Sequence, residues 1–222
     1  MTTYANANVP GGFLSPAATS FTVTNSTVAK VIVEQYAATG NFLGGCTLLD
    51  LMATSTDATA RDVQLYKGTV LSGAGTAYTS TTSTITRPSG SFITDGWLVG
   101  DQAMVFAPAG TAPNAAVDGI LLTVTGVAAL TLTFNGTPLA ALSLASGTRI
   151  CKVSPKFRAT IAATSGTSAS VSAVPLLNHA NDASTVRGEL KLGANNILIA
   201  QMPVAVSALP AAVSFDPVLA LY

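Results

Sequence analysis

The sequence predicts an all-β protein, and three observations lead to that prediction. Apolar and polar residues alternate with period two in several runs, for example in residues 61–66, whose odd and even side chains point to opposite faces. Turn residues separate these runs, most clearly Asn135-Gly136, since Asn-Gly between alternating runs is a strong hairpin signal. No window of ten or more residues shows the 3.6-residue apolar period of an amphipathic helix.

Residues 1–20 predict an extended N-terminal arm. Proline and glycine punctuate this segment, and it shows neither helical nor strand periodicity. Such an arm is either a frayed terminus or a strap laid on a neighbouring molecule. Phe13 and Leu14 are apolar residues on an otherwise small and polar tail, which favours the strap and makes both residues candidate interface residues.

The chain turns into strands from residue 21. Residues 21–25 and 28–36 are rich in β-branched residues, and residues 61–66 predict a strand with one buried face. Residues 46–52 fit either a short helix or a strand, of which the strand is favoured. Residues 73–83 have the Gly, Ala, Ser and Thr composition of a connector or boundary.

A self-contained unit follows the connector. Predicted strands at 83–87, 102–106, 119–127 and 130–134 alternate with turn residues, which suggests a small barrel or sandwich. Trp97 in this unit is predicted to anchor its core, and an exposed platform for a ligand is the alternative; Trp97 is also a candidate interface residue. Further strands are predicted after residue 149, at 157–161, 169–174, 190–192, 197–202, 211–215 and 218–222.

The composition favours assembly with other molecules. Only 20 of the 222 residues are charged, or 9%, against roughly 25% in an average domain. With 49% hydrophobic residues the chain can build a large core, which excludes the composition of a disordered protein. A formal net charge of zero provides no basic surface for nucleic acid, so no direct nucleic-acid partner is expected. Proteins near zero net charge tend to associate.

No membrane partner and no export signal are expected. The N-terminus lacks a basic segment followed by an apolar one. The apolar stretch 115–145 contains Asp118 and Pro138 and alternates Thr with Val and Leu, so it predicts strands rather than a membrane-spanning helix. Cys46 and Cys151 fit no metal or redox spacing, and two buried thiols are favoured over a disulfide.

The titratable residues point away from catalysis. His179 is the only histidine and lies among Asn, Ala and Asp residues, as a hydrogen-bonded loop histidine would. Two pairs of carboxylates are close in sequence, Asp57 with Asp62 and Asp95 with Asp101. They raise the alternatives of a glycosidase pair and a calcium site, but few aromatic residues and few converging carboxylates support either. No phosphate-binding loop is present. We expect no catalytic residue, no cofactor and no metal, and hence no enzyme.

One segment resembles a known viral domain. Residues 85–101 read Ile-Thr-Arg-Pro-Ser-Gly-Ser-Phe-Ile-Thr-Asp-Gly-Trp-Leu-Val-Gly-Asp, and two Val, Leu and Thr strands follow at 121–127 and 130–134. This pattern resembles a small β-domain of tailed-phage virion proteins, with Trp97 where an aromatic residue is usual. The resemblance covers residues 80–150 and departs from the pattern in the middle, where an Ala- and Pro-rich loop replaces a short turn.

The flanking segments resemble a phage virion β-sandwich. The motifs are Asp-Val-Gln-Leu-Tyr at 62–66, a Gly- and Thr-rich turn after residue 161, Pro-Leu-Leu-Asn at 175–178 and Leu-Gly-Ala-Asn-Asn-Ile-Leu at 192–198. Together the two resemblances imply a discontinuous β-sandwich formed by residues 21–73 and 150–222. The small β-domain, residues 80–149, is then inserted into one loop of the sandwich, and the N-terminal arm precedes both.

The resemblance implies a structural role in a virion. Proteins with an arm, a sandwich and an extra β-domain are similar to capsid decoration (cement) proteins, which commonly form homotrimers on the outer surface of the phage head. The implied partners are the major capsid protein and further copies of the chain, with assembly in the host cytoplasm. The alternative is a tail-tube, head-tail connector or baseplate protein, and a binder of host surfaces or glycans is a third possibility.

Overall fold

The fold is all-β, as predicted. The computed structural model describes residues 13–14, 19–22, 27–34, 46–72, 77–108, 114, 116–167, 173–176, 190–193, 195–206 and 210–221. All regular elements in these residues are strands, and none of them is a helix that could cross a membrane. The strands are β1 Phe13–Leu14, β2 Thr19–Phe21, β3 Lys30–Glu34, β4 Cys46–Ser55, β5 Arg61–Ser72, β6 Tyr78–Ser80, β7 Thr84–Thr86, β8 Gln102–Phe106, β9 Leu122–Val127, β10 Thr131–Phe134, β11 Leu142–Leu144, β12 Arg149–Ile161, β13 Val174–Pro175, β14 Leu190–Leu192, β15 Asn196–Gln201 and β16 Val213–Leu221.

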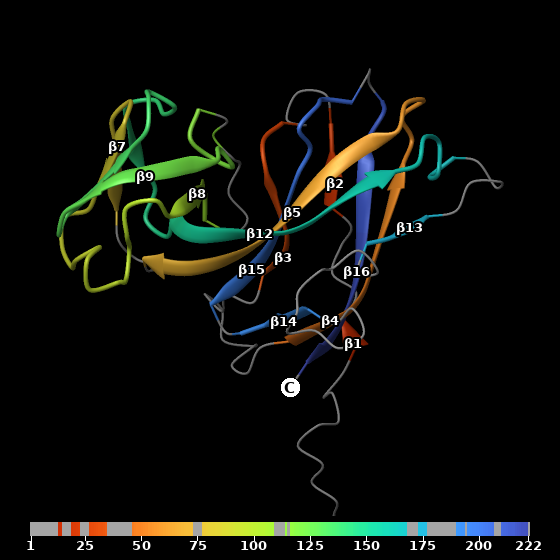
Figure 1. The fold of residues 1–222 in the computed structure, drawn as a ribbon, viewed down its shortest axis with the longest axis horizontal. Coiled ribbons are helices and arrows are strands. Elements are labelled where there is room, and N and C mark those ends of the chain that lie inside the picture. The colour runs from red at the N-terminus through yellow and green to blue at the C-terminus, as the bar shows by residue number, and fades with distance from the viewer. Residues whose placement is uncertain are drawn as a thin grey trace, which may run out of the picture.

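The first sheet is built on two long antiparallel strands, β4 and β16 (Figure 1). Short strands pair with their outer edges, β13 and β14 with β4, and β1 and β2 with β16. The two runs predicted at 211–215 and 218–222 therefore form one strand, β16, which contains Pro217. Proline is tolerated there because neither β1 nor β2 pairs with this stretch of the edge of β16.

The second sheet has ten strands in the order β11-β6-β7-β10-β9-β8-β12-β5-β15-β3. One half of this sheet, β12-β5-β15-β3, packs against the first sheet as a sandwich, and the other half forms the small unit to the left in Figure 1. The strand order is open at both ends, so the small unit is not a closed barrel.

The core of the sandwich lies between the two sheets. Phe21 and Phe215 of the first sheet meet edge to face, with ring centroids 5.4 Å apart. Leu65 and Phe157 face them from the second sheet and are also buried. Alternation with period two brings these side chains to one face, which is the physical basis of the sequence prediction.

A β-bulge lets β5 and β12 contribute to two different cores. Lys156 is the extra residue of β12 between the pairs Pro155↔Tyr66 and Phe157↔Leu65. On one side of the bulge Phe157 and Leu65 face the sandwich core, and on the other side Tyr66 lies on the opposite face of the sheet. The prediction of a strand with only one buried face at 61–66 was therefore wrong, because Tyr66 is buried as well.

The small unit, β6 to β11, lies between two paired strands. Its chain leaves at the end of β5 and returns at the start of β12, where Ser72 pairs with Ile150. The pairing of β8 with β12 joins the unit to the sandwich sheet without a break. Ile150 packs into the core of the unit together with Trp97. The two parts of the protein therefore share strands.

Other predictions compare with the structure as follows. Residues 46–52 belong to strand β4, so the favoured strand is confirmed and the helix is excluded. The predicted strand at 28–36 is observed as β3, whereas most of 21–25 and of 169–174 lies outside the described residues. Cys151 is a buried thiol that forms no disulfide.

Candidate functional site

The carboxylates of the first predicted pair do not face one another. Asp57 is fully buried and accepts hydrogen bonds from Arg61 Nε at 2.8 Å and from the Thr59 backbone at 2.9 Å. Asp62 accepts a bond from the Thr160 hydroxyl at 2.6 Å and pairs with Arg158. These two bonds hold the pKa of Asp62 below its ordinary value. Each carboxylate is thus fixed as an anion beside an arginine, an arrangement that suits structure rather than acid catalysis.

The second pair stabilises one long loop, residues 87–101. Asp95 pairs with Arg87, whose guanidinium carbon lies 4.9 Å from the centre of the Phe92 ring. Asp101 bonds to Lys152 at 2.8 Å and accepts a bond from the Leu98 backbone at 2.8 Å. Among the described residues no three His, Cys, Asp or Glu side chains group as a metal site would require.

Asp118 is a buried carboxylate near the junction of the small unit and the sandwich. Burial raises its pKa, although a 2.7 Å bond from the Asn114 backbone and the nearby Arg149 favour the charged form. Arg149 is buried as well and donates to the Ala107 carbonyl at 2.6 Å. These groups tie the loop after β8 to the start of β12, which is a structural function.

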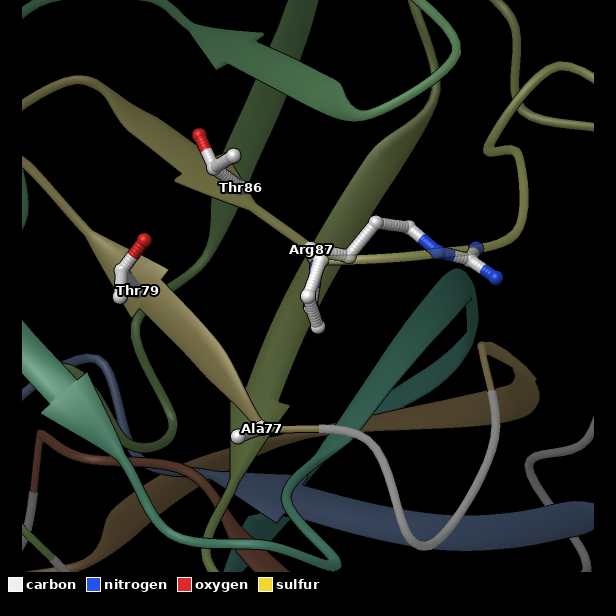
Figure 2. A pocket seen from close by; sticks show the side chains of 5 residues that line it. Ala77, Thr79, Thr86 and Arg87 are labelled. Atoms are coloured by element: carbon white, nitrogen blue, oxygen red, sulfur yellow. The ribbon is translucent and has the colours of Figure 1, made fainter.

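The small unit carries a shallow pocket of about 240 Å³. Ala77, Thr79, Thr86, Arg87 and Pro88 line it. Figure 2 shows the two threonine side chains on neighbouring strands and the Arg87 guanidinium directed away from them. The lining offers hydroxyl and methyl groups but no carboxylate or imidazole, so it can receive an apolar group and cannot perform acid–base chemistry.

The most exposed large apolar side chains of the small unit lie on the loop 87–101. Ile93, Leu98 and Val99 are 58%, 64% and 67% exposed, and we call these three residues the apolar tip. Leu130, in the adjoining β9–β10 turn, is 42% exposed. Clustered exposed apolar residues are typical of protein interaction surfaces.

The geometry of the loop explains why these side chains point outward. Phe92 and Trp97 turn into the core and are 0% and 2% exposed. Gly96 and Gly100 have positive φ values of 88° and 93°, which reverse the chain on either side of Leu98. Backbone bonds from Phe92 to Ala129 and from Gly100 to Val124 anchor the loop at both ends. The loop is therefore a fixed support for the apolar tip.

The candidate residues of the sequence analysis fall in three different places. Trp97 anchors the core of the small unit and offers no surface to a partner, so its assignment to an interface is corrected. Phe13 and Leu14 form β1, whose backbone pairs with Leu219 and Ala220 of the same chain, and their side chains lie outside the described residues. His179 also lies outside the described residues.

Sequence reasoning missed the apolar tip. The available signal was the run Trp97-Leu98-Val99 between Gly96 and Gly100, which places three apolar residues inside a turn. A turn of this length can bury only part of such a run, and the pattern does not show which part. Comparison of the chain with models of protein families, with curated proteins and with solved structures finds no match.

Proposed function

We propose that the chain is a non-enzymatic structural protein of a tailed-phage virion, a capsid decoration (cement) protein that binds neighbouring major capsid protein subunits on the outer surface of the head. The observation that carries the proposal is the apolar tip, held on a fixed loop of a chain in which only 9% of the residues are charged. The sequence resemblance of residues 85–101 and of the flanking strands supplies the virion setting.

The energetics of such a surface favour permanent assembly. Full burial of an exposed aliphatic side chain contributes about 1.5–3 kcal/mol, so covering the apolar tip contributes roughly 3–6 kcal/mol per copy. The charged groups of this loop are paired within the chain, Arg87 with Asp95 and Asp101 with Lys152. A neutral partner surface can cover the loop without stripping water from an isolated charge, which would cost several kcal/mol.

The ion pairs also support a non-enzymatic role. Asp57, Asp62, Asp95 and Asp101 each lie beside an Arg or Lys side chain. A general acid needs a carboxyl group whose pKa approaches the working pH, whereas a neighbouring cation lowers that pKa. Asp118, whose pKa is raised, bonds to the adjacent backbone and does not line the pocket.

Binding to phage heads tests the proposal. Purified protein is mixed with expanded empty heads, and the bound copies and the melting temperature of the heads are measured. We expect saturable binding and a higher melting temperature, since a ligand at 100 times its Kd stabilises its site by about 2.7 kcal/mol. Leu98→Asp should weaken binding, whereas Val204→Asp, at an equally exposed position of 63% on the sandwich, should not. Heads that bind no protein would contradict the proposal.

One observation favours the alternative of a tail-tube, connector or baseplate protein. Strand β11 ends the ten-stranded sheet and, among the described residues, pairs only with β6. An uncharged edge strand can pair with a strand of a neighbouring copy and so promote polymerisation. Self-assembly of the purified protein into tubes, without binding to heads, would support this alternative.

A further inference from the structure

We infer that the apolar tip of one copy docks into the Thr79–Thr86 pocket of a second copy. The inference deepens the proposed assembly role and depends on that role only for its biological setting. It combines two features of the small unit, a convex apolar surface and a concave one, which no part of the argument above has joined.

The convex partner is preformed. Ile93, Leu98 and Val99 project from a loop that backbone bonds hold against β9 and the β9–β10 turn. Because all three side chains are more than half exposed in this position, they do not fill the pocket of their own chain. The fixed loop also keeps the entropy cost of docking small.

The concave partner is preformed as well. Thr79 and Thr86 lie directly opposite one another on β6 and β7, and Ala77 and Pro88 close the two ends. The volume of about 240 Å³ is several times the share of one water molecule in the liquid, about 30 Å³, so an aliphatic side chain fits. β-Branched threonines have few rotamers, which keeps the shape of the pocket constant.

Neither surface carries a free charge. The one charged residue at the pocket, Arg87, turns its guanidinium away, donates to the Ser89 carbonyl and pairs with Asp95 (Figure 2). The apolar tip contains only aliphatic side chains. An apolar group can therefore enter the pocket without desolvating an unpaired ion.

A second copy is the occupant that these features favour. Every copy brings one apolar tip and one pocket, so the two are always present in equal number. The two surfaces differ, which makes the contact heterologous, and heterologous contacts close into rings or extend into filaments. A closed ring of this kind accommodates the homotrimer expected from the sequence.

Complementation between two variants tests the inference. Sedimentation of the full chain over a range of concentrations should show assembly beyond the monomer. Leu98→Asp removes the tip and Thr79→Arg blocks the pocket, and each should raise the dissociation constant at least about tenfold. An equimolar mixture of these two variants retains one intact tip and one intact pocket, and it should form a 1:1 dimer that neither variant forms alone.

Matched controls and contrary outcomes are available. Val204→Asp and Thr59→Arg change exposed residues of the sandwich and should leave assembly unchanged. A wild-type chain that stays monomeric, variants that assemble normally, or a mixture that forms no dimer would each overturn the inference. Binding of the same proteins to heads is measured separately, so loss of head binding with normal self-association would contradict the proposed function alone.

Discussion

Replacement of Trp97 by alanine is predicted to destabilise the small unit strongly. The indole is 2% exposed and packs in a core with Phe92, Leu132 and Ile150. Truncation of a buried tryptophan to alanine costs about 3–5 kcal/mol, because transfer free energy is lost and a cavity remains. For a chain of this length each kcal/mol lowers the melting temperature by about 2–4 °C, so we expect a decrease of roughly 6–20 °C.

Circular dichroism melts and urea titrations measure this effect directly. Trp97 is the only tryptophan, so its fluorescence in the wild-type chain also reports on this one site. Val204→Ala is the control, with an expected change within about 0.5 kcal/mol, since Val204 is 63% exposed. A loss below 1 kcal/mol for Trp97→Ala, or the emission of a water-exposed indole in the wild type, would refute the placement of Trp97 in the core.

Three further predictions concern buried charge, backbone conformation and pH. Asp57→Ala leaves Arg61 buried beside no carboxylate and should cost about 3–5 kcal/mol in a urea titration; a loss below 1 kcal/mol would contradict the buried ion pair. Gly119→Ala should lower the melting temperature more than Gly136→Ala, because both have φ near +70° but only at Gly119 would the new Cβ meet backbone, at 2.4 Å; equal shifts would contradict this. The raised pKa of Asp118 gives stability that is complete below its unfolded value of 3.8 and is lost as pH rises through the raised pKa, so the stability of Asp118→Asn relative to wild type should increase with pH; a constant difference would contradict it.

Much of the fold follows from local sequence patterns. The alternation in residues 61–66 and the turn at Asn135-Gly136 predicted a strand and a hairpin that the structure contains. The bulge at Lys156 could not be predicted, because an extra residue in β12 becomes visible only through its pairing with β5. That bulge explains why Tyr66 is buried on the face opposite Leu65. Long-range register therefore limits what periodicity alone can predict.

The candidate site shows the same limit in a turn. Trp97, Leu98 and Val99 are adjacent apolar residues, and sequence alone gave no reason to separate them. The positive φ values at Gly96 and Gly100 direct Trp97 into the core and leave Leu98 and Val99 exposed. The sequence analysis therefore assigned the interface to Trp97, whereas the structure moves this candidate surface to its neighbours.

The central claim is that this chain assembles on the outside of a phage head. A low-resolution electron microscopy map of the assembled particle, compared with one from a particle lacking the protein, tests it most directly. The account predicts additional density on the outer surface of the head, between neighbouring capsid subunits and in clusters of several copies. Density confined to the tail, or no difference between the two maps, would contradict the account.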